Sequence, residues 1–224
     1  MGLLSILPIS ALDHCIAMGL HLAAKQGVLF DRIPCDGDGF LDLAALEGLF
    51  RPSTRLVVLA HASNVSGTVQ DAAAVGRICA AHGVPFCLDA AQTAGHLPLS
   101  FRELGLSALS VPAHKGLMGP QGLGALLLAP DFAAALDPYV TGGTGSASNS
   151  EDQPAYMPDK FEPGTPNLPG IYGWEAALAY LQNIGVEQVR AHDLALSRRF
   201  LAGVVGVPGV RLLGPTDPQR RVGV

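Results

Sequence analysis

Four short, almost entirely apolar runs constrain the fold of this 224-residue chain more than any other feature. They cover residues 56–62, 84–90, 106–111 and 124–129. A strand that is apolar at consecutive positions is typical of a sheet covered on both faces, as parallel sheets are. Residues 71–82 separate the first two runs with apolar positions at helical spacing, and Gly83 ends that helix. This alternation predicts a three-layer α/β/α fold with a mainly parallel central sheet.

Helical spacing also predicts helices over residues 10–27, 41–49, 171–184 and 186–203, and a short strand is expected over residues 28–33. Residues 137–170 differ from the rest, because they are rich in Gly, Pro, Ser and Asn and have little periodicity. We expect a long loop there, and long loops in compact domains are usually functional or disordered.

The composition excludes several classes of function. Apolar residues make up 49% of the chain and charged residues 15%, which indicates a packed core. The net charge is −5, and the clustered Lys and Arg of a nucleic-acid surface are absent. No apolar run reaches the roughly 18 residues of a membrane span, and the apolar start lacks the basic region of a signal peptide. We therefore expect a cytoplasmic protein that binds neither nucleic acid nor membrane.

The four cysteines form no CxxC pair, and they are Cys15, Cys35, Cys79 and Cys87. Cys79 and Cys87 lie inside apolar stretches, which is typical of buried, reduced thiols. We expect neither a disulfide framework nor a metal site.

Polar residues directly follow three of the predicted strands: His61 and Asn64, then Asp89 and Gln92, and then His114 and Lys115. Ligands of open α/β sheets bind beyond the carboxyl ends of the strands, so we expect these side chains at one edge. Each has an ordinary explanation of its own, since Asp89 can cap a helix, Asn64 can stabilise a turn and Lys115 can extend into solvent. Their joint arrangement favours a functional site.

A lysine and a carboxylate at one sheet edge suit an aldehyde cofactor. A neutral lysine amine forms a Schiff base with an aldehyde, and partial desolvation of the lysine favours the neutral form. Pyridoxal 5'-phosphate is the common aldehyde cofactor, and a carboxylate must keep its pyridine nitrogen protonated. Lys115 and Asp89 are candidates for these two roles.

Five segments resemble the class V aminotransferase family in their order and spacing: ASNVSGT at 62–68, LDAAQTAGHLPL at 88–99, AHKGLMGPQGLGALLL at 113–128, GGTGS at 142–146 and FEPGTPNLPGI at 161–171. Within that family they are most similar to the cysteine desulfurases and selenocysteine lyases. The resemblance spans nearly the whole chain and implies the large domain of a fold-type I pyridoxal-phosphate enzyme.

The resemblance implies a role for each residue at the sheet edge. Lys115 would form the Schiff base and later carry protons at the substrate α-carbon, and Asp89 would pair with the pyridinium nitrogen. Gln92 would hydrogen-bond the ring oxygen of the cofactor, and Asn64 would lie beside that oxygen and the substrate. His114 would reach the phosphate.

Two further segments carry implied site residues. His14, in ALDHC at 11–15, would stack on the pyridine ring, and the alternative for it is a histidine on a helix surface. Gly143 and Thr144, in GGTGS, would reach the phosphate of the neighbouring subunit, which implies a homodimer.

The chain departs from the family pattern in four ways. Pro112 stands where a Ser or Thr hydroxyl usually binds the phosphate, and an earlier Gly-Thr phosphate segment is absent. No cysteine follows Cys87, so the sulfur-accepting cysteine is missing, as is the arginine for the substrate carboxylate. We therefore expect a chain truncated at both ends, with residues 1–185 in the large cofactor domain and residues 186–224 beginning the small C-terminal domain.

The implied parent activity is the removal of sulfur from L-cysteine, which gives L-alanine and a persulfide, with a sulfur-acceptor protein as a further partner. We expect this activity to be incomplete in the present chain. The alternatives are another enzyme with the same cofactor (an aminotransferase, an epimerase or a selenocysteine lyase) and an inactive fragment that binds the cofactor weakly or serves only in dimerisation.

Overall fold

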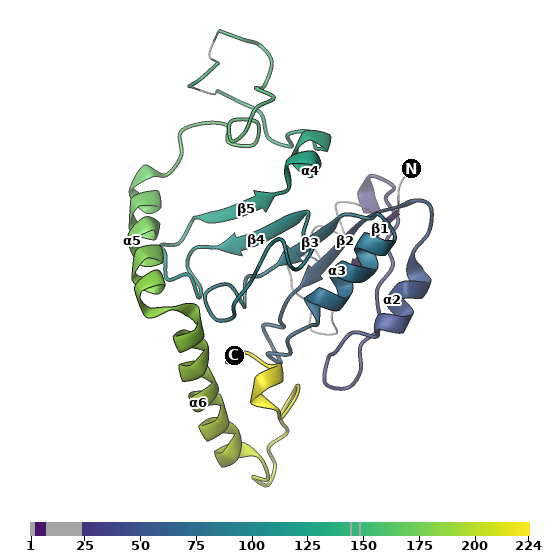
Figure 1. The fold of residues 1–224 in the computed structure, drawn as a ribbon, viewed down its shortest axis with the longest axis vertical. Coiled ribbons are helices and arrows are strands. Elements are labelled where there is room, and N and C mark those ends of the chain that lie inside the picture. Colours follow the sequence, from purple (N-terminus) through teal and green to yellow (C-terminus); the bar gives the residue numbers. More distant parts are fainter. Residues whose placement is uncertain (1–2, 8–23, 144, 148) are drawn as a thin grey trace.

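A five-stranded sheet forms the centre of the chain (Figure 1). The computed structural model describes residues 3–7, 24–143, 145–147 and 149–224. In spatial order the strands are β1 (Leu3–Leu7), β2 (Thr54–Ala60), β3 (Phe86–Asp89), β4 (Ala108–Pro112) and β5 (Gly124–Leu128). The first four run parallel, and β5 runs antiparallel to β4. The predicted α/β class with a mainly parallel sheet is therefore confirmed.

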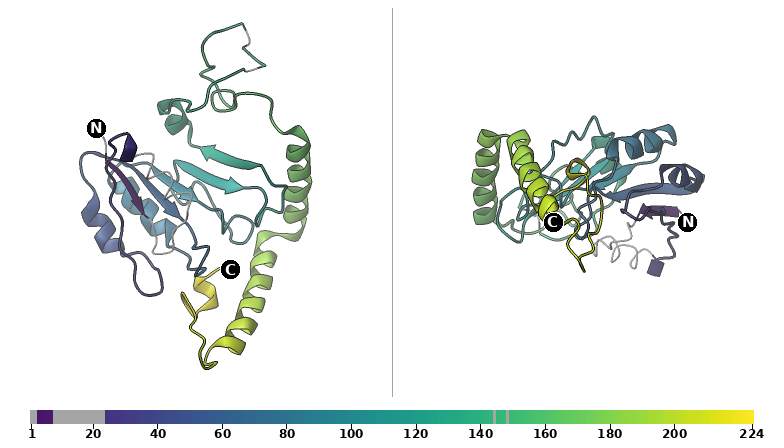
Figure 2. Two further views of the ribbon diagram at one scale, coloured as in Figure 1. Left: turned by 180° about the vertical axis from the view of Figure 1, so that it is seen from behind. Right: turned by 90° about the horizontal axis from the view of Figure 1, so that it is seen from below.

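Helices lie beside the sheet in two groups (Figures 1 and 2). The elements are α2 (Leu43–Leu49), α3 (Ala72–Ala81), α4 (Pro130–Ala135), α5 (Leu168–Ile184), α6 (Val186–Val204) and the 3-10 turn η1 (Pro218–Arg220). α2 and α3 lie on the same face of the sheet, whereas α5 stands beside β4 and β5, and α6 continues from α5 toward the C-terminal segment. Carboxylate and amide side chains cap three of the helices, because Asp42, Asp71 and Asn167 accept hydrogen bonds from Ala45, Ala74 and Gly170 backbone N–H groups.

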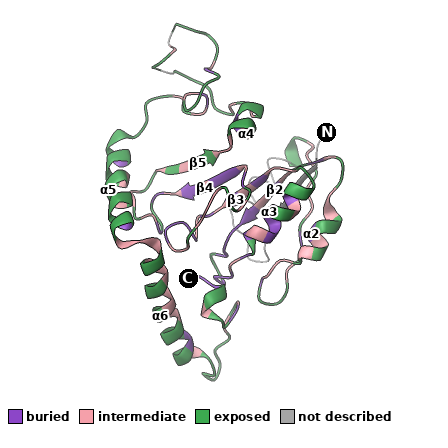
Figure 3. Ribbon diagram, in the orientation of Figure 1, coloured by how far each residue is buried: buried purple, intermediate pink, exposed green. Residues whose placement is uncertain are grey.

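The core lies between the middle strands and α3 (Figure 3). Its largest fully buried side chains include Leu59, Phe86, Leu88 and Val75. Burying an aliphatic or aromatic side chain of this size contributes about 1.5–3 kcal/mol. The sheet is thus a rigid base, and it fixes the positions of the residues that directly follow its strands.

Two strand expectations differ from the structure. The apolar start contains β1, whose Leu4 and Leu7 pair with Leu56 and Leu59 of β2. The strand expected over residues 28–33 is wrong, because Leu29 is 62% exposed and no strand forms over these residues. A short, mostly apolar segment such as LLSIL does not reveal its pairing partner, and β2 lies about 50 residues further along the chain.

The remaining expectations have clear outcomes. The short helix at 41–49 and the helix at 71–82 form as α2 and α3, and the helix expected from 171 begins at Leu168, directly after its Asn167 cap. Most of the helix predicted over residues 10–27 lies outside the described residues. The described part of 137–167 holds neither helix nor strand, as expected for a loop. Among the described helices, none has the length and apolar character needed to cross a membrane.

Candidate functional site

The register of the parallel strands brings three strand ends to one edge of the sheet. Ala60 at the end of β2 pairs with Asp89, and Asp89 pairs with Ser110 of β4. The backbone N–H of His61 continues this alignment by donating to the Asp89 carbonyl oxygen at 2.8 Å. The residues that follow β2, β3 and β4 therefore leave the sheet side by side.

Asn64 lies at the exposed tip of the turn that follows β2. The hydroxyl oxygen of Ser63 accepts hydrogen bonds from the Val65 and Ser66 backbone N–H groups, which closes this turn. Gly67 then takes a φ of +74°, and a Cβ there would lie 2.5 Å from the Val222 carbonyl oxygen. The C-terminal segment thus supports the turn from behind, while Asn64 points away from the core.

Asp89 is the last residue of β3, and it is half-buried. Its Oδ1 accepts a hydrogen bond from the Ala91 backbone N–H at 2.9 Å, which holds the carboxylate at the start of the next turn. Gln92 lies in that turn and is also half-buried. Burial, and secondarily the negative charge of Asp89, raise the pKa of the Cys87 thiol to about 11. The Asp89 charge is therefore close enough to Cys87 to disfavour its thiolate.

Lys115 lies in the turn that follows β4. Gly119 N–H donates to the Ala113 carbonyl at 2.7 Å and Met118 N–H donates to the Lys115 carbonyl at 2.9 Å, which closes the turn. His114 and Lys115 are both exposed, so the described residues do not supply the partial desolvation expected for Lys115. The reason is positional, because this turn extends beyond the end of the sheet.

Two glycines bring the turn of Lys115 into contact with the turn of Gln92. A Cβ on Gly95, whose φ is +84°, would lie 2.2 Å from the Gly116 carbonyl oxygen. A Cβ on Gly116 would in turn lie 2.4 Å from the Ala94 carbonyl oxygen. Such backbone contact is open only to glycine. It fixes the amine-bearing turn against the turn that begins at Asp89.

The groups at this edge fit pyridoxal phosphate. Among the described residues, no hydrogen bond or ion pair engages the side chains of Asn64, Gln92, His114 or Lys115. They offer an amine for the aldehyde, amides for the ring oxygen and an imidazole for the phosphate, and Asp89 adds the carboxylate for the ring nitrogen. The chemistry of the donor set therefore matches each polar part of that cofactor.

Of the remaining predicted site residues, only Gly143 belongs to the described structure, and it does not lie at this edge (Figure 1). His14 and Thr144 lie outside the described residues. Gly143 is exposed in the long loop between α4 and α5, where its carbonyl accepts a hydrogen bond from Gly164 N–H at 2.7 Å. That loop extends away from the strand ends (Figure 1).

Sequence reasoning missed two contacts behind the site. His61 forms a buried hydrogen bond to Thr93, and His96 pairs with Asp193 of α6. The motif at 88–99 contains Thr93 and His96, but their partners lie 32 and 97 residues away in sequence. No local pattern reveals such pairs.

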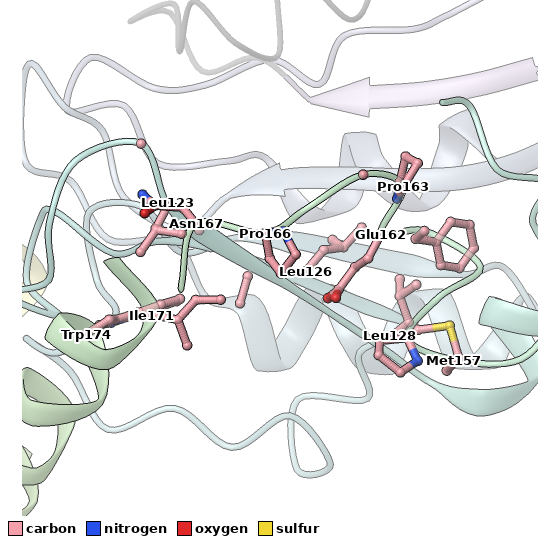
Figure 4. Close-up of a pocket in the computed structure, with 16 residues that line it drawn as sticks. Leu123, Leu126, Leu128, Met157, Glu162, Pro163, Pro166, Asn167, Ile171 and Trp174 are labelled. Carbon is pink, nitrogen blue, oxygen red and sulfur yellow. The ribbon is translucent and has the colours of Figure 1, made fainter. Parts of the chain in front are cut away.

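A cavity of about 620 Å³ lies along β5 and contains none of the predicted site residues (Figure 4). Leu126 and Leu128 line one wall, and Met157, Pro166 and Trp174 are among the residues opposite. It is a groove between an edge strand and the long loop. The polar chemistry of the chain lies instead at the strand ends.

Comparisons with known proteins identify the family of the chain. The profile of the class-V aminotransferases matches residues 9–224. A probable cysteine desulfurase of Methanothermobacter thermautotrophicus is 34% identical over 204 residues, which are 89% of this chain and 50% of that relative. The apo structure of a cysteine desulfurase from Thermococcus onnurineus NA1 has a TM-score of 0.86 at 27% identity and covers 99% of this chain and 55% of that one. SspA in complex with cysteine has a TM-score of 0.68 at 25% identity and covers 80% of this chain and 48% of that one. The chain thus spans about half the length of each of these proteins.

Proposed function

The chain belongs to the class-V aminotransferase family, and on this premise we propose that it is the cofactor-binding part of a pyridoxal-phosphate-dependent cysteine desulfurase. The observation that carries the proposal is the strand register that joins Ala60, Asp89 and Ser110. It supports a single site to which the turns after β2, β3 and β4 all contribute.

Each residue at the edge would act on one part of the cofactor. Lys115 would provide the point of covalent attachment, and Asp89 would hold the proton of the ring nitrogen. The Ala91 N–H on Oδ1 limits the rotation of that carboxylate. Asn64 and Gln92 would bind at the ring oxygen, and His114 would bind the phosphate. When bound, pyridoxal phosphate supplies the electron sink that stabilises negative charge at the α-carbon of an amino acid.

The residues of the chain itself would move the proton. Nζ of Lys115 would take the proton that leaves the substrate α-carbon, because its exposed turn lets the amine reach beyond the strand ends. The contact between Gly95 and Gly116 would hold this turn in register with Gln92 during that transfer. L-cysteine is the proposed substrate, and the cysteine complex of SspA supports it.

The sulfur-accepting thiol is proposed to be neither Cys79 nor Cys87. Burial raises the pKa of Cys79 to about 12, against the smaller opposite effect of a backbone hydrogen bond, and burial raises the pKa of Cys87 to about 11. Both thiols therefore stay protonated at neutral pH, and a protonated thiol is a poor nucleophile. A thiol other than these two would accept the sulfur.

A homodimer is part of the proposal, because Gly143 and the neighbouring Thr144 would serve the partner's phosphate. The exposure of Gly143 in the long loop supports this assignment. Size-exclusion chromatography with light scattering, run with and without pyridoxal phosphate, tests it. A monomer under both conditions would contradict the role of these residues.

The test of the cofactor site is covalent capture. Purified chain is incubated with pyridoxal phosphate and reduced with borohydride, and the modified lysine is mapped by peptide mass spectrometry. We expect modification at Lys115, loss of it in Lys115→Ala, and no loss in the control Lys25→Ala, which removes another exposed lysine. Modification spread equally over Lys25, Lys115 and Lys160, or none at all, would refute the proposal.

A further inference from the structure

We propose that His96, held by Asp193, is a positioning residue for the turn that carries Lys115. Nδ1 of His96 lies 2.8 Å from Oδ2 of Asp193, which projects from α6. His96 itself lies in the turn of Gln92, four residues further along the chain. The inference rests on the proposed function of Lys115, and it assigns a role to two residues outside the cofactor contacts.

The opposite edge of the imidazole ring contacts the backbone next to Lys115. A Cβ placed on Gly116 would lie 2.4 Å from Cδ2 and 2.6 Å from Nε2 of His96. Real Cβ atoms do not approach other atoms so closely, so only a glycine at position 116 leaves room for the ring where it lies. The His96 ring therefore lies between α6 and the turn of Lys115, and we call it the wedge. One ring edge is hydrogen-bonded to Asp193 of α6, and the other edge limits the position of the Lys115 turn.

The support behind the wedge is itself anchored. Arg190, one turn before Asp193 on α6, donates hydrogen bonds to the backbone carbonyls of Pro218, Gln219 and Arg221. Burial lowers the pKa of Arg190, and the negative charge of Asp193 acts against this effect, which indicates that the two side chains are close. α6 thus holds Asp193 while it is tied to the C-terminal segment.

This arrangement has a consequence for the amine. A catalytic group misplaced by about 1 Å can cost up to about 100-fold in rate, so a wedge that sets one turn of the backbone matters for reactivity. Without His96 or its Asp193 partner, the turn of Lys115 gains freedom, although every proposed cofactor contact is still present in the chain. The expected defect is slow covalent capture with little loss of noncovalent binding.

The experiment compares His96→Ala and Asp193→Ala with two controls. Asp193→Asn keeps an oxygen acceptor for His96. His82→Ala removes a second histidine–carboxylate pair, with Glu47, at 2.9 Å and at similar histidine exposure (34% against 35%), far from the strand ends. Three quantities are measured. Amide hydrogen exchange of residues 113–119 is followed without cofactor, and the total amount of bound pyridoxal phosphate is determined by equilibrium dialysis. The rate of covalent capture at Lys115, trapped with borohydride, is measured at saturating pyridoxal phosphate.

We expect both alanine variants at 96 and 193 to show about tenfold faster exchange over 113–119 and about tenfold slower capture, at nearly unchanged total binding. Asp193→Asn and His82→Ala should remain close to the wild type in all three measurements. Wild-type exchange and capture in His96→Ala would overturn the inference, and so would equal effects of His96→Ala and His82→Ala.

Two further outcomes separate this inference from the proposed function. Faster exchange in the alanine variants, combined with no capture in the wild type, refutes the cofactor site and supports the wedge. If His96→Ala does not fold, Asp193→Ala and Asp193→Asn decide: equal capture by these two variants overturns the role of the His96–Asp193 pair.

Discussion

His61 and Thr93 join the end of β2 to the turn after β3 through a hydrogen bond of 2.9 Å between Nδ1 and Oγ1. The bond is closed to solvent, since His61 is 7% exposed and Thr93 is 0% exposed. The backbone of His61 also bonds to Asp89. These residues lie behind the exposed edge and support the turn of Gln92 from the interior.

The burial of His61 predicts a dependence of stability on pH. Burial lowers the pKa of His61 from 6.5 to about 4, so the unfolded state binds a proton between these values and the folded state does not. The contribution of this group to the free energy of unfolding is then fully present above pH 6.5. It falls as the pH decreases toward 4, by up to about 3 kcal/mol. Urea unfolding at several pH values should show a smaller decrease in His61→Asn. Parallel curves for the wild type and this variant would contradict the assignment.

The contact between Gly95 and Gly116 predicts an unusually costly glycine substitution. Gly95→Ala places a Cβ against the Gly116 carbonyl and also forces a side chain into positive φ, so we expect a loss of about 3 kcal/mol or more. Gly122→Ala is the matched control, because its φ is +79° and no atom lies within 4 Å of the added Cβ. It should cost only about 1–2 kcal/mol. Equal free energies of unfolding for the two variants would show that the steric contact is absent.

Lys160 caps the C-terminal end of α4, and we expect this contact to stabilise the fold. Its Nζ donates hydrogen bonds to the Ala133 and Ala134 carbonyls at 2.9 and 3.3 Å, and the side chain is buried. Lys160→Met removes these bonds and the favourable charge at the helix C-terminus, so we expect a loss of about 1–3 kcal/mol in chemical denaturation. Lys25→Met at an exposed position should change the free energy of unfolding by less than about 0.5 kcal/mol. A neutral Lys160→Met would contradict the capping role.

The open edge of β5 predicts self-association. Ala113 N–H bonds to Leu123 and Ala129 N–H bonds to Ser107, so by antiparallel alternation the backbone groups of Leu126 point away from β4. The Leu126 side chain is also 56% exposed, and apolar edge strands tend to aggregate. Leu126→Lys should reduce concentration-dependent association in sedimentation velocity experiments. Leu196→Lys on α6, at 54% exposure, is the control, and an equal reduction there would exclude a specific effect of the edge.

If the proposed site is correct, replacing Pro112 by threonine should increase the affinity of the chain for pyridoxal phosphate. Pro112 pairs with Gly124 between two hydrogen-bonded pairs, so its missing N–H leaves no gap in the ladder toward β5. Pro112→Thr adds a hydroxyl that can bind the phosphate, and we expect pyridoxal phosphate to bind about tenfold more tightly. Pro112→Val has a similar shape without the hydroxyl and should not improve the dissociation constant. Equal affinities for both variants would place the phosphate elsewhere.

Much of the fold was open to prediction from local pattern. The apolar runs at β2 and β3 and the helical spacing of α3 were sufficient, because side-chain periodicity depends on neighbours in sequence. The edge that gathers Asp89 and Lys115 followed from the rule that parallel strands end together. β1 is not predicted from the sequence, because a five-residue, mostly apolar segment does not show which strand it pairs with.

By itself, the sequence determined most of the strands and helices that follow residue 40, and which chemical groups stand at the strand ends. Only the tertiary structure decided that His96 meets Asp193, that Gly116 lies under an imidazole edge, and that β5 is left without a neighbour on one side within the described residues. The physical reason is that periodicity and turn chemistry act over a few residues. Contacts between residues up to 97 positions apart depend instead on how the folded elements pack against one another.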